Sequence, residues 1–355
     1  MVEVWTHLTA APRAIADEAR IAEAQGWDGL GVVDSQNRSG DPYVALTMAA
    51  TVTEHLGLAT AVTNSVTRMA AATAAAIASV DRISDGRAVL GIGRGDSALA
   101  DVGRAPARVA SFETYLRHLQ AYLRGEAVPF DAIEVSAAPS VDELHLADAA
   151  PESRIRWLQG GRKVPVEVAV SGPRMIAIAA VHADRLMFAL GADEERIAWG
   201  IEVAKAARAS AGLDPQEIAF GVYVNCVCHP RIEIARDLVK GGLTTFARFS
   251  ILHGTVTGPA SEQTREALET LHNVYDMRAH TRGDSRQAQT LTPEFIDRFA
   301  IVGTPERCVE RLQGLASLGL DKLFLATNFT LMQTQAGIDA IALAAKEVLP
   351  ALQAP

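Results

Sequence analysis

The stretch RAVLGIGRGDSALADVGRAPAR, residues 87–108, decides the fold. It opens with the apolar run Ala88-Val89-Leu90, which is typical of a buried strand. The chain then turns through Gly91, Gly93 and Gly95, residues that let a backbone take positive φ and come close to a ligand. In α/β proteins a glycine-rich turn after a buried strand lies at the carboxyl end of the sheet, where ligands bind. The question for the rest of the chain is which residues it places around residues 91–96.

Strand and helix signals alternate on both sides of this turn. Short apolar runs are followed by segments of helical spacing, and Pro or Gly marks many of the boundaries. Such alternation predicts βαβ units with parallel strands. Strands are expected at 2–7, 28–34, 56–64, 87–91, 164–171, 184–190, 218–228 and 321–327. Helices are expected at 13–25, 42–53, 69–83, 106–123, 173–182, 193–210, 305–319 and 338–349, and a long helical region is expected over 232–280.

Eight such units predict an α/β protein, a (β/α)₈ TIM barrel with insertions. The alternative is an open doubly wound sheet. A dinucleotide-binding sheet, however, would carry Gly-x-Gly-x-x-Gly after its first strand, whereas this chain has Gly-x-Gly-x-Gly after its fourth. We therefore expect one domain over 1–355, with insertions at about 125–163 and 230–290, where the alternation breaks down.

Composition excludes several classes of protein. The 355 residues carry a net charge of −9, which disfavours nucleic-acid binding through a basic face. No run of 18 uncharged apolar residues predicts a membrane span, and no signal peptide is visible, so we expect a cytoplasmic protein. The three cysteines, Cys226, Cys228 and Cys308, are too few for a disulfide framework. Cys226-Val227-Cys228-His229 lacks the second ligand pair of a structural zinc site, so no metal is expected.

Residues 85–108 resemble the fourth-strand region of the luciferase-like monooxygenases, and more narrowly the branch that contains the methylenetetrahydromethanopterin reductases. Further similarity lies in residues 59–68, 170–173 and 299–305. The resemblance implies a TIM barrel that binds FMN or the deazaflavin coenzyme F-420 (8-hydroxy-5-deazaflavin) at its carboxyl face. It also implies a small-molecule substrate and a homodimer.

The resemblance further implies a set of site residues. Asp34 and Ser35 fall where the family lines the coenzyme ring, although some deazaflavin enzymes of the family have histidine at the position of Ser35. A non-proline cis peptide is expected between Ala61 and Val62, as a bulge behind the ring. Asp96 falls where one branch has a proton donor. The remaining coenzyme-binding candidates are Thr63, Gly93, Arg94 and Gly95, with Ser171 and Gly172 at the phosphate.

Each candidate also has a structural interpretation. In that interpretation the glycines serve only to turn the chain, and Asp96 precedes Ser-Ala-Leu as a helix cap would. Ser171-Gly172-Pro173 is also an ordinary helix start, and Arg94 could be an exposed side chain. His7, at the end of the first strand, is the second catalytic candidate or a structural histidine.

The predicted function is that of an oxidoreductase that uses reduced coenzyme F-420 or a flavin to transfer hydride to a small organic substrate. Two alternatives remain open. One is an FMN-dependent monooxygenase of the bacterial luciferase type, and the other is a non-catalytic flavin-binding barrel. The intact turn at 91–96 and the full set of eight units favour an enzyme.

Overall fold

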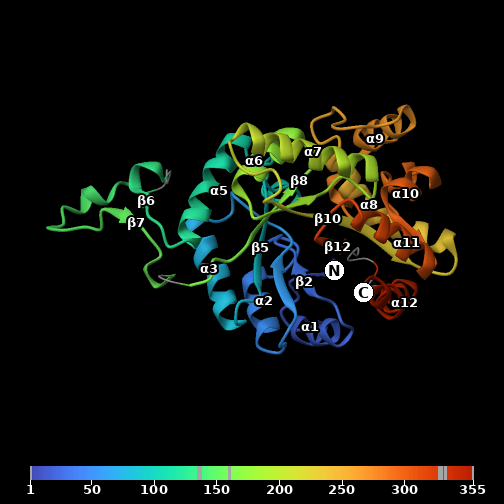
Figure 1. Ribbon diagram of the computed structural model, residues 1–355, viewed down its shortest axis with the longest axis horizontal. Coiled ribbons are helices and arrows are strands. Elements are labelled where there is room, and N and C mark those ends of the chain that lie inside the picture. Colours follow the sequence, from blue (N-terminus) through green and yellow to red (C-terminus); the bar gives the residue numbers. More distant parts are fainter. Residues whose placement is uncertain (1, 134–137, 159–160, 327–330, 332–333, 354–355) are drawn as a thin grey trace.

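Eight parallel strands close into a barrel in the computed structural model, which describes residues 2–133, 138–158, 161–326, 331 and 334–353 (Figure 1). Each strand pairs with its neighbours along the chain, and β12 pairs with β1 to complete the ring. This is the predicted (β/α)₈ barrel. Its strands are β1 (Glu3–Leu8), β2 (Gly29–Val32), β3 (Gly57–Thr60), β5 (Ala88–Gly93), β8 (Val166–Val170), β9 (Arg185–Phe188), β10 (Ala219–Cys228) and β12 (Lys322–Ala326).

Helices cover the outside of the barrel and bury one face each against the strands. Most of them fall within the expected ranges, with ends that differ by a few residues. They are α1 (Ile15–Ala24), α2 (Pro42–Ala50), α3 (Ala70–Ile83), α5 (Val109–Leu123), α6 (Pro173–His182), α7 (Glu194–Ser210), α8 (Ile232–Phe249), α11 (Pro305–Ala316) and α12 (Gln335–Leu343). The last continues through a π-helical turn (Ala344–Val348) into α13 (Leu349–Gln353).

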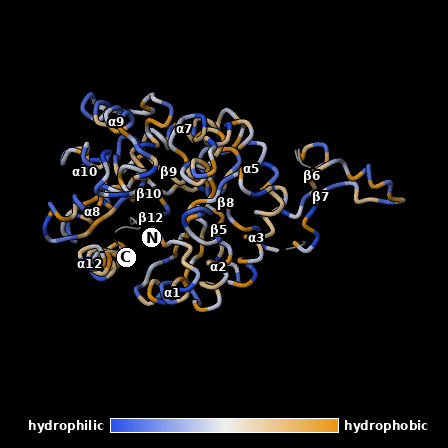
Figure 2. Tube along the Cα trace, turned by 180° about the vertical axis from the view of Figure 1, so that it is seen from behind, coloured by the Kyte–Doolittle hydropathy of each residue, from blue (hydrophilic) through white to orange (hydrophobic). Residues whose placement is uncertain are grey.

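Large side chains fill the inside of the barrel. Trp5, Met187, Tyr223 and Phe324 are buried together and form a layer across its interior. Strands β5 and β8 carry largely apolar residues, which appear orange near the centre of Figure 2. Because this layer closes the interior, a ligand can enter only from an end of the barrel.

Four differences from the expected elements have local causes. The long helical region expected over 232–280 consists of two helices, α8 and α9 (Glu262–Val274), with a break between them. Gly254 and Gly258, both at φ +77°, and Pro259 interrupt it.

The other three differences are short elements. α4 (Ser97–Ala100) follows the β5 turn, and α10 (Pro293–Phe299) begins at the capping residue Thr292. A strand of three residues, β11 (Ile301–Gly303), pairs with the end of β10.

The segment expected as an insertion at 125–163 leaves the barrel as an arm, seen at the left of Figure 1. Its base is a small antiparallel pair, β6 (Val128–Pro129) with β7 (Glu152–Ser153). The rest of its described part is loop and short 3₁₀ turns. Among the described residues, no helix is long and apolar enough to cross a membrane.

Candidate active site

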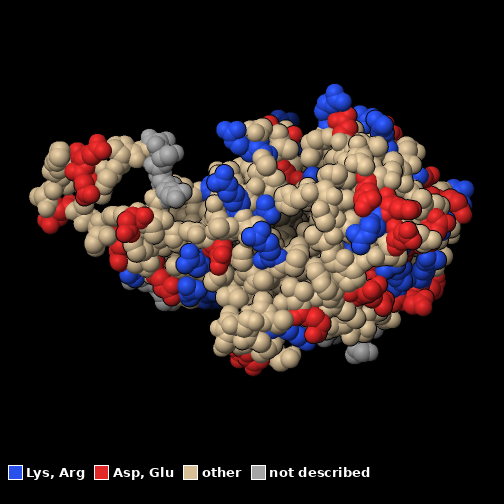
Figure 3. Space-filling model, turned by 90° about the horizontal axis from the view of Figure 1, so that it is seen from above, with Lys and Arg blue, Asp and Glu red and all other residues tan. Residues whose placement is uncertain are grey.

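A cavity of about 920 Å³ opens at the carboxyl end of the barrel strands. Residues from the ends of all eight barrel strands line it, together with parts of α8 and the segment after α9. In the space-filling view it is a hollow flanked by Lys and Arg side chains (Figure 3). All the predicted site residues line this cavity except Thr63 and Gly172. The remote parts of the sequence that the resemblance picked out therefore meet at one place.

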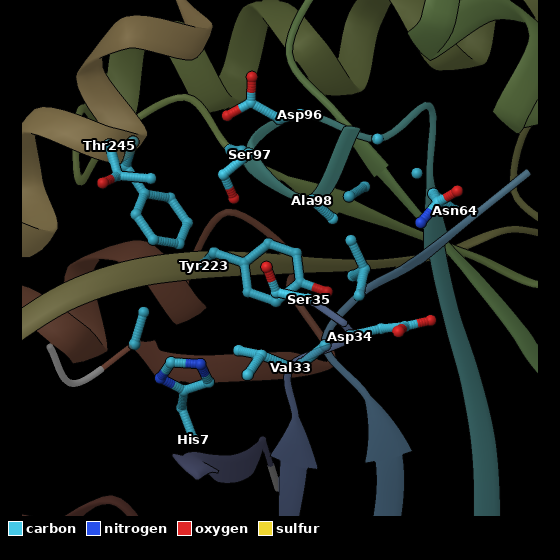
Figure 4. A pocket seen from close by; sticks show the side chains of 18 of the residues that line it. His7, Val33, Asp34, Ser35, Asn64, Asp96, Ser97, Ala98, Tyr223 and Thr245 are labelled. Carbon is cyan, nitrogen blue, oxygen red and sulfur yellow. The ribbon is translucent and has the colours of Figure 1, made fainter. Parts of the chain in front are cut away.

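The end of β2 contributes two side chains with different roles. The buried Asp34 carboxylate accepts hydrogen bonds of 2.6 Å from both Thr63 Oγ1 and the Arg68 guanidinium, and it turns away from the centre of the cavity (Figure 4). Ser35 projects into the cavity, and its buried Oγ has no hydrogen-bond partner among the described residues. Thr63 therefore lies outside the cavity wall and holds the Asp34 carboxylate in place, whereas Ser35 offers a free hydroxyl to a ligand.

The predicted cis peptide is present between Ala61 and Val62. It lies between β3 and the short strand β4 (Thr63–Asn64), and both of its residues line the cavity. Asn64 Oδ1 accepts from the amides of Val66 and Thr67 at 2.9 Å, which fixes the side-chain amide. Asn64 Nδ2 is then left buried without a described partner, so a second unused hydrogen-bonding group lies at the cavity.

The glycines of the β5 turn differ in what they do. A β-carbon on Gly91 would overlap the carbonyl oxygen of Thr60, so this glycine lets two strands approach. Gly95 has φ +85°, a conformation that side chains rarely allow. Gly93 would accept a β-carbon at ordinary contact distance from Val62. Only Gly93 and Gly95 line the cavity, so packing alone explains Gly91.

Asp96 is not a side-chain helix cap. Helix α4 begins directly after it, yet its carboxylate makes no capping hydrogen bond. Instead Asp96 Oδ2 accepts from the guanidinium of Arg248 on α8, and both side chains are largely buried. Asp96 and His7 lie on opposite sides of the cavity in Figure 4. The two catalytic candidates therefore face different parts of a bound ligand.

A cationic region lies beside the start of α6. Arg94 donates through Nε to the carbonyl of Ala107 at 2.6 Å. Burial and the neighbouring charge of Arg174 lower the pKa of Arg94. Neither arginine forms an ion pair within the described part of the chain. Ser171 lines the cavity, whereas Gly172 caps α6 with open space beside its α-carbon. The region can therefore accept an anionic group.

Several functional candidates escaped sequence reasoning. Tyr223 extends from β10, and Arg38 follows β2. His280 comes from the turn after α9. All three line the cavity, and Arg248 holds Asp96 at its edge. Only Tyr223 lies in a strand with a clear sequence signal.

The three cysteines meet in one place. Cys226 and Cys228 on β10 lie close to Cys308 on α11, and all three thiols are free and buried. A hydrogen bond with Cys308, and then burial, raises the pKa of Cys228 above the usual range, and a hydrogen bond with Cys226, together with burial, raises the pKa of Cys308 against the opposing effect of Cys228. Among the described residues, no group of three or more His, Cys, Asp or Glu side chains is arranged so that it could hold a metal ion.

Comparisons with known proteins identify close counterparts. The family model described as luciferase-like monooxygenase matches residues 2–322. A 5,10-methylenetetrahydromethanopterin reductase from Methanolobus tindarius is 26% identical over 315 residues, 87% of this chain and 88% of that protein. Two solved structures share the fold. The coenzyme F-420-dependent tetrahydromethanopterin reductase from Methanopyrus kandleri has a TM-score of 0.74 at 19% identity, covering 98% and 99% of the two chains. An F-420-dependent secondary alcohol dehydrogenase has a TM-score of 0.70 at 15% identity, covering 99% of both.

Proposed function

The chain belongs to the luciferase-like monooxygenase family, and from this premise we propose that it uses reduced coenzyme F-420 to transfer hydride to a small organic substrate. The observation that carries the proposal is the cavity, with unused hydrogen-bonding groups in its wall and a cationic region at the start of α6. The relatives named above favour the deazaflavin over FMN. FMN, and with it a monooxygenase, is the second candidate.

The residues present fit such a coenzyme. Ser35 Oγ and Asn64 Nδ2 are buried polar atoms that a ring with carbonyl and NH groups would satisfy. The Ala61–Val62 bulge gives an apolar surface for one face of that ring. Arg94 and Arg174 would hold a phosphate at the start of α6. The site therefore matches a flat, polar-edged ring with an anionic tail.

The chain's own residues would then do three things. When bound, the reduced coenzyme supplies the hydride. Ser35 and Asn64 would fix the ring, and the apolar walls from α8, including Phe246 and Phe249, would exclude water from the substrate. Asp96 would hold or deliver the proton that balances hydride transfer, with Arg248 setting the direction of its carboxylate. His7 is the other candidate for that role.

Coenzyme titration tests the proposal. Fluorescence titration with coenzyme F-420 and, separately, with FMN is expected to give a dissociation constant below about 100 μM for the deazaflavin, or about −5.5 kcal/mol. Arg174→Gln is expected to weaken binding about tenfold, with Arg20→Gln, an exposed arginine on α1, as control. Tighter binding of FMN would favour the monooxygenase. Binding of neither would refute an enzyme of this family's chemistry.

A homodimer is part of the proposal. The outward side of α2 carries no charged residue, and Val44 on it is 56% exposed. Two further apolar residues, Met69 and Ile83 at the two ends of α3, are 48% and 47% exposed. A helix that is apolar on all sides is normally buried, and a second copy of the chain would cover this face. Val44→Glu is expected to convert the dimer to a monomer in light scattering.

We also propose a cytoplasmic location. The three cysteines remain free although they lie close together, which fits a reducing compartment. Fractionation of the source cells would test this location.

A further inference from the structure

His280 lies in the cavity wall between two ion pairs. Asp96 pairs with Arg248 on one side. On the other, Arg38 holds Asp101 through Nε at 2.5 Å and a second nitrogen at 3.0 Å. His280 itself is 8% exposed and lines the cavity. Because each guanidinium has its own carboxylate, this part of the wall presents no unpaired charge within the described residues.

A hydrogen bond fixes the imidazole. Tyr275 OH and His280 Nδ1 are 2.8 Å apart. The guanidinium of Arg248 stacks over the Tyr275 ring at 4.8 Å. Arg248 also lies within hydrogen-bonding reach of the phenol oxygen, as a donor, so we assign the Tyr275 O–H as the donor to Nδ1. The proton of a neutral His280 is then on Nε2, for which no partner is recorded in the described part of the chain.

The surroundings keep this imidazole neutral. Burial, with the charges of Arg38 and Arg248, lowers the pKa of His280 to about 4, against the opposing effect of Asp96 and Asp101. Burial also raises the pKa of Tyr275, which therefore remains a phenol and a donor.

The backbone next to His280 is held in a rare conformation. Thr281 lines the cavity with φ +67°, a value that a β-branched residue seldom adopts. The buried side-chain amide of Gln287 clamps the preceding turn by donating to the carbonyls of Asp276 and Ala279, both at 3.1 Å. Such strain persists where the surrounding structure imposes it, commonly at ligand sites.

We propose that His280 is the hydrogen-bond donor that orients the substrate, and that the substrate presents an uncharged acceptor, such as a carbonyl oxygen or imine nitrogen. The inference rests on the proposed function and names the substrate class of that site. An anionic substrate group is disfavoured here, because both guanidinium groups are already paired. Thr281 is a positioning residue, since it directly follows His280 in the left-handed region and its Oγ1 donates to the His280 carbonyl at 2.6 Å.

Nitrogen-15 NMR of the full chain tests the tautomer without needing a coenzyme. The His280 signals are assigned by their loss in His280→Gln. At pH 7 we expect a neutral ring with the proton on Nε2, and loss of that preference in Tyr275→Phe. Cyclohexanone at millimolar concentration is expected to shift the Nε2 resonance, whereas cyclohexanecarboxylate is not. A proton on Nδ1, or no response to cyclohexanone, would overturn the inference even if the coenzyme binds.

Kinetics test the same donor during turnover. With reduced coenzyme F-420 and the uncharged carbonyl compound that is reduced fastest, His280→Leu is expected to raise KM at least tenfold and leave the coenzyme dissociation constant within twofold. His280→Gln retains an N–H donor, so its KM should stay within threefold of the parent's. The control is His253→Leu, which replaces an exposed histidine after α8 and should also keep KM within threefold. Thr281→Gly should unfold at a higher temperature yet show a higher KM. An unchanged KM in His280→Leu would overturn the inference, whereas failure to bind the coenzyme would overturn the proposed function alone.

Discussion

Arg248 donates to the carboxylate of Asp96 across 152 residues of sequence and so joins α8 to the turn after β5. The pair lies beside the cavity, and both of its members are largely buried. An aspartate in such a pair can act as a proton donor or can simply fix α8 in place. The two roles predict different results for substitutions of the two partners.

If Asp96 handles the proton, Asp96→Asn should lower kcat about 100-fold and leave the coenzyme dissociation constant unchanged. Arg248→Met breaks the same ion pair but keeps the carboxyl group, so it should lower kcat far less. The double variant completes a cycle that separates the two roles. Equal losses of kcat in the two single variants and the double variant would show that turnover depends on the ion pair rather than on Asp96 as an acid.

Ser35→Ala should weaken coenzyme binding about fivefold, equivalent to about 1 kcal/mol for one hydrogen bond. The melting temperature of the coenzyme-free protein should not fall, because Ser35 Oγ has no partner within the described residues to lose. Ser79→Ala on the exposed side of α3 is the matched control. If Ser35→Ala lowers the melting temperature and leaves the coenzyme affinity unchanged, Ser35 contributes to the stability of the fold rather than to coenzyme binding.

Sequence patterns predicted the barrel because its signals are local. Apolar runs, turn glycines and helix-starting prolines each act within a few residues, and they located all eight barrel strands. The interruption of the helical region expected over 232–280 was also visible in sequence, at Gly254 and the Gly258-Pro259 pair. Strand β11 was not predicted, because a strand of three residues is too short to show a periodic pattern of apolar residues.

The candidate site was predicted only in part, for a physical reason. The residues that follow the strand ends, from His7 to Ser171, meet because the barrel brings strand ends together. Arg248 and His280 come from segments outside the eight strands. Their approach to Asp96 depends on how α8 and the turn after α9 pack over the barrel, which no local pattern specifies.

The pKa of His280 predicts how stability depends on pH. Because that pKa is lowered from about 6.5 to about 4, the unfolded chain binds the proton more readily between these values. Stability is therefore fully present above pH 6.5 and is lost as pH falls toward 4, by about 2 kcal/mol between pH 7 and pH 5.

Urea unfolding at both pH values should show this loss in the parent and a smaller loss in His280→Gln. Equal losses in the two proteins would contradict a buried neutral imidazole. Other groups titrate in the same range, so the difference between the two proteins is the quantity to compare.

The last prediction concerns the opposite end of the barrel strands. Lys322 is fully buried and donates to Glu167 Oε1 at 2.6 Å, while its ammonium lies 3.5 Å from the centre of the Trp5 ring. Burial lowers the pKa of Lys322, and the charge of Glu167 opposes that change. Arg185 also donates to Glu167, at 2.6 Å. Glu167 is thus the nearer and more deeply buried carboxylate for both cations, whereas Glu3 Oε2 lies 3.8 Å from Lys322 and 3.7 Å from Arg185.

Glu167→Gln should therefore lower the free energy of unfolding by about 3–5 kcal/mol, because the more distant and half-exposed Glu3 is then the one carboxylate recorded near this buried positive charge in the described part of the chain. Lys322→Met should cost less, since Glu167 keeps Arg185 as its partner and the methionine stem can pack against Trp5. Denaturant unfolding of the two variants at pH 7 measures the difference. In Lys322→Met, which remains folded, coenzyme affinity should equal that of the parent, because these residues do not line the cavity. If Lys322→Met lowers the free energy of unfolding more than Glu167→Gln does, the lysine rather than the carboxylate contributes more to the stability of the barrel.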